Sequence, residues 1–522
     1  MTASKQGRDD NYSERRIFAV LGVLPEPGGY GIAKFSRSSM PYQKWIMELT
    51  QEGAEKFYES FYFDYGHASI ADLAHLTIVL ENISMVAAEE LWDEPLIDGQ
   101  ASSTRYQDFE KRGFHVPEEL YKTKYEEPYR ALCEKLIGEY KAFHQEILAH
   151  LIKKYSHERP SDMDDAKYER TMKARTFDIV RYLLPMSIRT GLGHIMSART
   201  LERQLVRLFS HPLKEIQSIA QELKDAVVEK PAFNPMVERL KPLLQKLEEQ
   251  LPPNEQAKKL LEDFKRITHF GAPVAPTLVK YTKPSEYLIK TYQALRTAVA
   301  GLALPLPDDR RGVTLIEPHD QTTEKICTLL YRVSPYAYTQ IKQAVDKMSQ
   351  TKKRELLDLA YKYRGTHDQP IRETRTGYEL IFDLCLDCGA WRDFHRHRRC
   401  VQINKDLNAA YGFDTPKEIE QAGLAERYSA LMKEAAELSS AIEKEFAFVG
   451  QYALPFAFRR RCLLKLDAEE LQYIVELRTR PENHFSVREI AYKMYERFAT
   501  RYPQQASYFR VIPPDQEEFF KR

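Results

Sequence analysis

The stretch Phe394-His395-Arg396-His397-Arg398-Arg399 places three arginines and two histidines at the end of an apolar segment. Apolar residues precede it at helical spacing, at Leu380, Leu384, Cys388 and Trp391. This spacing predicts a helix with one buried face. Because arginine is costly to bury without an anion, the cluster requires carboxylates of the protein or phosphates of a ligand. The alternative is a solvated basic helix end, which the helix dipole favours.

The composition limits the class of protein. A chain of 522 residues and 60.9 kDa is too long for one hydrophobic core, so several domains are expected. The 77 basic and 76 acidic residues nearly cancel, so we expect neither nucleic acid nor a membrane as a partner. The amino-terminal segment lacks the apolar core of a signal peptide, and the six cysteines fit a reducing environment. We therefore expect a cytoplasmic protein.

Cys385 and Cys388 form an isolated Cys-x-x-Cys pair. No second pair of Cys or His residues at metal-site spacing accompanies it. We therefore expect these two cysteines to be core residues rather than zinc ligands, and no metal site is predicted.

The chain carries two copies of one pattern. His67 and His367 are 300 residues apart, and Pro117 and Pro416 are 299 residues apart. Further along the chain, Pro185 and Pro455 are 270 residues apart, and His211 and His484 are 273 residues apart. Two near-constant separations, divided by one length change of about thirty residues, indicate a tandem duplication.

The duplication predicts the domain organisation. We expect a polar tail over residues 1–15, a first repeat over 16–230, a proline-rich helical connector over 231–310, and a second repeat over 311–522.

Some elements of each repeat can also be predicted. Ile17–Leu24, ended by a turn at Pro25–Gly29, and Gly312–Ile316 are matching strands. A helix is expected over Leu73–Leu91. Further helices should begin after Ser197 and after Asp467, the latter with Glu470 in a capping box.

These motifs resemble the flavin-dependent thymidylate synthases. That family has Arg-His-Arg, seven residues, then Ser with an Arg shortly after, together with a Gly-His-x-Ser segment, an Arg before Leu-Pro, and a late Leu-Arg…His. The first repeat is similar at Gly66–Ser69, Gln100–Tyr106, Val180–Pro185 and Ser197–Leu201. The second repeat is similar at Arg396-His397-Arg398, Glu476-Leu477-Arg478 and His484.

Each repeat also departs from the signature. Asp93-Glu94-Pro95 stands at the Arg-His-Arg position of the first repeat. In the second, Asp406 replaces the motif Ser and Asn408 replaces the following Arg. Carboxylates at these positions would repel a phosphate. The surviving motifs are complementary, so the resemblance implies one working site that pools residues of both repeats.

The resemblance implies an α+β, helix-rich fold with two tandem domains of this family, and FAD as cofactor. The implied flavin contacts are Arg396, His397, Arg398 and His484, with Arg199 as a further candidate. The implied nucleotide contacts are Ser103, Arg105, Arg181, Arg207 and Arg478. Of these, Arg207 or Arg478 is the candidate to stabilise negative charge developing on the pyrimidine carbonyls.

The implied reaction is methylation of dUMP to dTMP, with methylenetetrahydrofolate as carbon donor, reduced FAD as hydride donor and NADPH as reductant. Such chemistry needs no side-chain nucleophile, which suits a chain without a Ser-His-Asp or Cys-His arrangement. A homodimer forming a pseudo-tetramer is expected. Two alternatives remain open: an inactive flavin- or nucleotide-binding or regulatory relative, and a flavoenzyme acting on another nucleotide.

Overall fold

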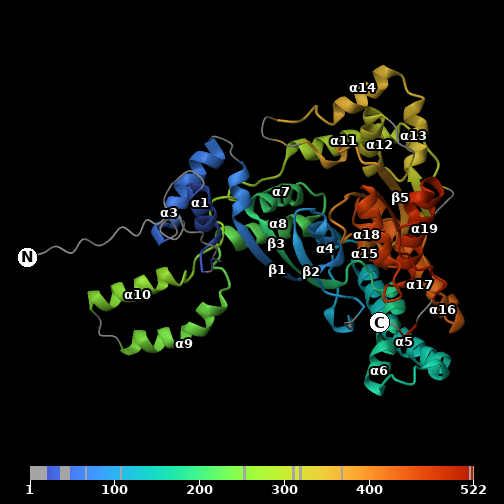
Figure 1. Cartoon of the computed structure of the whole chain (residues 1–522), viewed down its shortest axis with the longest axis horizontal. Coiled ribbons are helices and arrows are strands. Elements are labelled where there is room, and N and C mark those ends of the chain that lie inside the picture. The colour runs from blue at the N-terminus through green and yellow to red at the C-terminus, as the bar shows by residue number, and fades with distance from the viewer. Residues whose placement is uncertain are drawn as a thin grey trace, which may run out of the picture. The chain divides into compact units, whose positions relative to one another are not determined.

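The computed structural model describes residues 20, 22–35, 47–64, 68–105, 109–250, 254–307, 312–316, 320–365, 368, 370–516 and 519–520 (Figure 1). The chain forms two compact units. The smaller comprises Met1–Leu76, Ser197–Arg199 and Asp225–Lys280, and the larger comprises Thr77–Met196, Thr200–Lys224 and Tyr281–Arg522. Several predicted landmarks, namely Gly66, His67, Tyr106, Thr366 and His367, lie outside the described residues.

The smaller unit contains the helices α1 (Pro25–Phe35), α3 (Gln51–Tyr58), α9 (Pro235–Gln250) and α10 (Glu255–Ile267). The predicted turn at Pro25–Gly29 is wrong, because these residues form the first turns of α1, where proline is tolerated. Of the predicted strand Ile17–Leu24, residues 17–19 and 21 are not described, and the other four are in no strand.

The larger unit contains the main parts of both repeats. The first-repeat elements are β1 (His75–Ser84), α4 (Met85–Trp92), β2 (Asp98–Ala101), α5 (Glu126–Tyr155), α6 (Asp165–Val180), β3 (Arg189–Ser197), α7 (Ala198–Phe209) and α8 (Lys214–Val228), of which β1, β3, α7 and α8 have ends in the smaller unit. The remaining elements are α11 (Glu286–Ala300), β4 (Gly312–Ile316), α12 (Gln321–Arg332), α13 (Tyr338–Asp346), α14 (Gln350–Leu359), β5 (Leu380–Asp387), α15 (Cys388–Phe394), β6 (Val401–Asn404), α16 (Lys417–Gln421), α17 (Ala425–Glu445), β7 (Arg459–Leu466), α18 (Ala468–Arg478), α19 (Phe485–Arg501) and α20 (Pro503–Ala506).

Each repeat has a small sheet, and three strands follow the same order in both, while β4 is an additional edge strand of the second. The first has the order β1-β3-β2 and the second the order β4-β5-β7-β6. β5 and β7 are antiparallel, with a register from Leu380↔Leu466 to Asp387↔Arg459. β2 and β3 are also antiparallel, from Asp98↔Ile195 to Ala101↔Leu192. The shared order and the helix-rich composition agree with the predicted α+β class and tandem duplication.

Helices cover both faces of the second sheet. One core packs Phe382, Leu384 and Leu464 against residues of α15, α18 and α19. The other packs Ile381 and Leu463 against residues of α11, α12, α13 and α14. Figure 1 shows these two groups of helices on opposite sides of β5. This sheet is therefore the centre of the larger unit's second half.

The predicted helix that begins at Leu380 is wrong. Leu380–Asp387 is the strand β5, and the helix α15 begins only at Cys388. Every residue of β5 is buried, so the alternation that identifies a half-exposed strand is lost. The predicted helix Leu73–Leu91 is also wrong, because the strand β1 occupies most of it and the helix α4 begins only at Met85.

Other predicted elements are confirmed. β4 spans Gly312–Ile316, and α7 begins at Ala198 directly after Ser197. Asp467 is the N-cap of α18, and its side chain accepts a hydrogen bond of 2.8 Å from the backbone N–H of Glu470.

The repeats meet in a reciprocal contact inside the larger unit. The backbone N–H of Met186 donates to Leu454 O (2.9 Å), and that of Phe456 donates to Leu184 O (3.0 Å). Pro185 and Pro455 form an antiparallel bridge between these two bonds. Since Leu184 is equivalent to Leu454 and Met186 to Phe456, the repeats are related here by an approximate two-fold axis.

Candidate functional site

The Arg-His-Arg motif lies in the turn that follows α15. Asp387 caps this helix, because its side chain accepts a hydrogen bond from Ala390 N (2.7 Å). The helix ends at Phe394, so the motif lies between α15 and β6. Arg396 is exposed, whereas His397 is buried. The sequence therefore anchors the motif between a capped helix and a buried strand.

His397 orients Arg478, which comes from α18. Nε2 of His397 accepts a hydrogen bond from Nε of Arg478 (2.9 Å). Because arginine only donates, Nδ1 of His397 carries the hydrogen and faces Glu470 Oε1 at 3.5 Å. Burial lowers the pKa of His397, in keeping with a neutral ring. Arg478 also donates to the carbonyl of Asp393 (2.8 Å), so its guanidinium is held at both ends.

The first repeat contributes Ser103 and Arg105. Arg105 forms a bidentate ion pair with Asp178 (2.7 and 3.1 Å) and also donates to Glu482 O (3.0 Å). The hydroxyl of Ser103 accepts from the backbone N–H of Arg105 (3.2 Å). Arg105 thus reaches the second repeat, because Glu482 follows α18.

Two further guanidinium groups lie nearby. Arg181 is buried and donates to Gly389 O (3.0 Å) across the two repeats. Arg392 donates to Thr104 Oγ1 (3.0 Å) and to Ser102 O (3.3 Å). Burial, with Arg181 among the nearby cations, lowers the pKa of Arg392 to about 10. Sequence reasoning missed Arg392, although it stands four residues before Arg396.

Arginines of both repeats surround the carboxylate of Asp393. Burial opposes ionisation of this group, yet its pKa is lowered by Arg181, Arg478, Arg105 and Arg396. We call Arg105, Arg181, Arg392, Arg396 and Arg478 the cationic cluster. The acidic neighbours of the cluster include Asp178, Asp393 and Glu89, which are fewer than its five guanidinium groups. Such an excess of guanidinium groups suits an anionic ligand.

Arg398 extends the cluster toward the first repeat. Its Nη2 donates to Asp98 Oδ1 (2.9 Å), and its guanidinium lies 5.7 Å from the ring centre of Trp92. Its Nη1 is buried and has no hydrogen-bond partner among the described residues. A buried guanidinium nitrogen without an acceptor indicates room for a ligand oxygen or water. The residues of this turn therefore fit a phosphate-bearing group.

Three other predicted residues lie in different surroundings. His484 is fully buried, with one ring nitrogen at 3.0 Å from Asp178 O and the other accepting from Ser486 N at 3.3 Å. Arg199 belongs to the smaller unit, where it pairs with Asp72 (2.8 Å). Arg207 donates instead to Glu90 Oε2 (3.1 Å) and to Glu90 O (2.6 Å).

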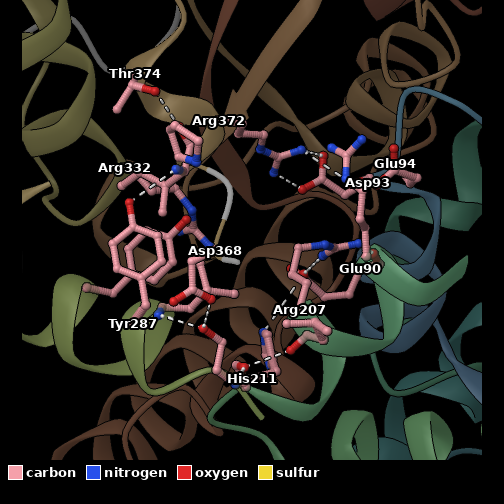
Figure 2. Close-up of a pocket in the computed structure, with 18 of the residues that line it drawn as sticks. Glu90, Asp93, Glu94, Arg207, His211, Tyr287, Arg332, Asp368, Arg372 and Thr374 are labelled. Atoms are coloured by element: carbon pink, nitrogen blue, oxygen red, sulfur yellow. Dashed lines mark hydrogen bonds and ion pairs between the residues drawn. The ribbon is translucent and has the colours of Figure 1, made fainter. Parts of the chain in front are cut away.

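Arg207 lines a large cavity, which we call the Arg207 cavity (Figure 2). It measures about 630 Å³, and all of its lining residues belong to the larger unit. Asp93 forms a bidentate ion pair with Arg372, and Asp406 pairs with Arg332 at 3.1 Å. Despite burial, Arg372 holds the pKa of Asp93 well below its usual range. These carboxylates are therefore ionised and neutralised in place.

The Arg207 cavity is the counterpart of the cationic cluster. Glu90 and Asp393 stand 303 residues apart, and each backbone carbonyl accepts from an arginine near the end of the repeat's last motif helix, Arg207 and Arg478 respectively. Asp93 and Glu94 stand where the other site has Arg396 and His397. The Arg207 cavity therefore has no counterpart of the Arg-His-Arg motif, although other arginines line it.

The described part of the chain has neither a metal-binding cluster nor a membrane-spanning helix. No group of three or more His, Cys, Asp or Glu side chains there has the geometry to hold a metal ion. Within the same residues, no helix is long and apolar enough to cross a membrane.

Comparisons with known proteins agree with the two-repeat organisation. The family model described as "Thymidylate synthase complementing protein" matches residues 30–231 and 314–504. A UPF0159 protein of Thermoplasma acidophilum is 22% identical over 512 residues, covering 92% of this chain and 94% of the relative. A UPF0159 protein of Chlamydia muridarum is 22% identical over 528 residues, covering 95% and 92%.

Among solved structures, a crystal structure of the flavin-dependent thymidylate synthase ThyX from Helicobacter pylori, complexed with FAD and dUMP, is 18% identical. The match covers 39% of this chain and 89% of that chain, with a TM-score of 0.26. A second structure of the same enzyme with FAD and dUMP is 19% identical and has a TM-score of 0.25. It covers 40% of this chain and 90% of that one.

Proposed function

Because this chain belongs to the thymidylate synthase complementing protein family, we propose that it is a flavin-dependent thymidylate synthase with one site pooled from both repeats. The reaction is methylation of dUMP to dTMP, with methylenetetrahydrofolate as carbon donor and NADPH as reductant. The enzyme acts in the cytoplasm as a homodimer whose four repeats form a pseudo-tetramer.

One observation carries the proposal. The pKa of Asp393 is lowered by two guanidinium groups of the first repeat, Arg105 and Arg181, and two of the second, Arg396 and Arg478. Each repeat alone lacks half of this set. The pooled set supplies the cationic contacts that a nucleotide phosphate and a flavin diphosphate require.

The flavin side of the site consists of Arg396 and Arg398. Arg396 is exposed and has no ion-pair or hydrogen-bond partner among the described side chains, and Nη1 of Arg398 is buried without an acceptor. Two guanidinium groups with free donors match the diphosphate of FAD. When bound in its reduced form, FAD supplies the hydride.

The substrate side consists of Ser103 and Arg105. The Ser103 hydroxyl is free to donate to a phosphate oxygen while it accepts from Arg105 N. The pairing with Asp178 fixes the plane of the Arg105 guanidinium, so its position does not depend on the substrate. Arg181, buried behind them, adds positive potential without leaving its contact with Gly389.

Arg478 is the group proposed to stabilise negative charge on the pyrimidine. Its hydrogen bonds to His397 and to the carbonyl of Asp393 fix its direction before substrate arrives. A fixed donor gives more stabilisation of developing charge than one that must reorganise. Arg207, the equivalent residue, faces Glu90 in the Arg207 cavity instead.

Complementation of a thymidine-requiring bacterial strain tests the proposal. The wild-type chain should restore growth, and Arg478→Lys should abolish it, because lysine lacks the fork that meets His397 and Asp393 together. Arg207→Lys is the matched control and should still restore growth. Failure of the wild-type chain, or loss with Arg207→Lys alone, would contradict the proposal.

A binding protein without turnover is the second candidate. It is favoured by the existing bidentate contact between Arg105 and Asp178, which competes with a substrate phosphate. This candidate predicts a flavin-containing protein that dUMP stabilises thermally, yet that forms no dTMP in the presence of methylenetetrahydrofolate and NADPH.

A further inference from the structure

The Arg207 cavity contains more hydrogen-bond donors than its own acceptors use. Six arginines line it, and three of them are paired: Arg207 with Glu90, Arg332 with Asp406, and Arg372 with Asp93. The other three, Arg203, Arg296 and Arg375, have no acceptor among the described residues.

The other carboxylates of the cavity have their contacts elsewhere among the described residues. Besides the three paired ones, Asp368 accepts from Gly365 N (2.9 Å) and Ser285 Oγ (3.4 Å). Glu94 accepts from Leu96 N (3.4 Å), and Glu202 also has a partner. The protein thus leaves guanidinium groups, not carboxylates, available to a ligand in this cavity.

Arg296 is the most informative of the free cations. It is partly buried, and its pKa is lowered chiefly by that burial, although Asp406 lies close enough to oppose the change. A guanidinium removed from water without an acceptor is unfavourable unless an anion reaches it. Its charge instead lies 4.7 Å from the centre of the Phe448 ring.

Phe448 is held at the cavity in an unfavourable backbone conformation. Its φ of 71° lies in the left-handed region, which bulky residues rarely adopt. Glu443 stabilises this loop, because its carboxylate accepts from Phe448 N (2.7 Å) and Gly450 N (3.1 Å). Strain maintained in this way at a cavity indicates a functional constraint on the ring.

The remaining lining residues complete an aromatic and apolar wall. Tyr287, Tyr292, Leu288 and Ile371 face the same cavity as Phe448. The hydroxyls of both tyrosines are engaged, with Ala360 O (2.6 Å) and with Glu373 (3.0 Å) respectively, so their rings are held in position. A volume of about 630 Å³ is in the range of small-molecule sites.

We propose that the Arg207 cavity is a second ligand site, distinct from the pooled site, which binds an aromatic phosphate monoester. The phosphate lies against Arg296, Arg203 and Arg375, and the ring lies against Phe448 and the two tyrosines. A phosphate is favoured over a carboxylate because three guanidinium groups match three terminal oxygens. Asp93 and Glu94, at the position of Arg396 and His397, exclude the flavin from this cavity.

Calorimetric titration of the full-length protein with phenyl phosphate, inorganic phosphate and benzoate tests this site. Phenyl phosphate should bind most tightly, and Arg296→Ala should weaken it about tenfold or more. Arg354→Ala, an exposed arginine on α14 outside the cavity, is the matched control and should leave the affinity unchanged. The variant Arg396→Ala/Arg398→Ala, altered in the pooled site, should also leave it unchanged.

A second variant separates ligand binding from folding. Phe448→Gly relieves the positive φ, so the melting temperature should not fall, while the affinity for phenyl phosphate should drop about three- to tenfold. Equal affinity for benzoate would overturn the phosphate assignment. Binding of none of the three probes, or an unchanged affinity in Arg296→Ala, would overturn the site itself. These results do not depend on whether the pooled site is active.

Discussion

The turns after α4 and after α15 occupy equivalent positions in the two repeats but carry opposite charge. The first has Asp93 and Glu94, and the second has Arg396 and His397. Both turns are held by the same backbone contact, from Arg207 to Glu90 O and from Arg478 to Asp393 O. Contacts to the backbone were kept after duplication while the side-chain charges diverged. One backbone scaffold thereby presents different side-chain charges in the two repeats.

The helix caps next to these turns also kept a contact while their side chains changed. In the first repeat Ser84 caps α4 and its hydroxyl donates to Glu215 (2.7 Å). In the second, Asp387 caps α15 and accepts from the hydroxyl of Ser486. The carboxylate and the hydroxyl have exchanged places between two pairs separated by 303 and 271 residues. The hydrogen bond was retained while its donor and acceptor residues swapped.

Substitutions at these caps should have the largest effect on the free energy of unfolding. Ser486→Glu brings a second buried carboxylate against Asp387 and should lower the free energy of unfolding by about 3–5 kcal/mol. Adding Asp387→Ser reproduces the first-repeat arrangement and should restore stability to within about 1 kcal/mol of wild type. Denaturant unfolding of the single and double variants measures both. A double variant no more stable than Ser486→Glu would disprove the equivalence of the two caps.

The sheets also differ in a buried ion pair. Asp383 binds Arg461 (3.0 and 3.2 Å), whereas the equivalent positions of the first repeat are Leu80 and Gly191. Asp383→Leu should cost about 3 kcal/mol or more, because it leaves the Arg461 charge buried alone. Asp383→Leu with Arg461→Met should recover most of that loss. Unfolding curves that place the double variant below the single one would contradict this interpretation.

His194 gives the first repeat a pH dependence that Leu464, its equivalent, does not have. Burial, aided by Arg398, lowers the pKa of His194 from 6.5 to about 4. As the pH falls from 6.5 to 4, the unfolded chain binds the proton and the folded one does not, so stability is lost. His194→Leu should therefore be about 3 kcal/mol more stable than wild type at pH 4. Melting at pH 7 and pH 4 measures this, and an equal gain at both pH values would exclude the titration.

Replacing either of two equivalent glycines with alanine should destabilise the protein to a similar extent. Gly113 and Gly412 have φ values of 66° and 68°, and a Cβ at either would meet only ordinary contacts, so the cost of Ala is backbone strain. Gly113→Ala and Gly412→Ala should each cost about 1–3 kcal/mol. Thermal melting of the two variants provides the comparison. A difference larger than about 1 kcal/mol would mean that the turns at Gly113 and Gly412 are no longer equivalent.

The sequence was sufficient to predict the duplication and the strand β4, but not the strands β1 and β5. Landmarks such as Pro117, Pro416 and His484 survive divergence because they occupy helix caps. β5 could not be recognised, because helices cover both its faces and its apolar run shows no alternation. Motif comparison predicted that Arg105 and Arg396 belong to one site. Arg392 and Arg296 lie outside the motifs, and only the fold brings them to the cationic cluster and the Arg207 cavity.

The flavin content of the purified protein tests the central claim most directly. If the two repeats share one pooled site and the Arg207 cavity excludes flavin, absorbance should give one FAD per chain. Arg396→Ala/Arg398→Ala should reduce this to none, while Arg372→Ala, which alters the Arg207 cavity, should leave it at one. Two flavins per chain, or one that persists in Arg396→Ala/Arg398→Ala, would contradict the pooled site.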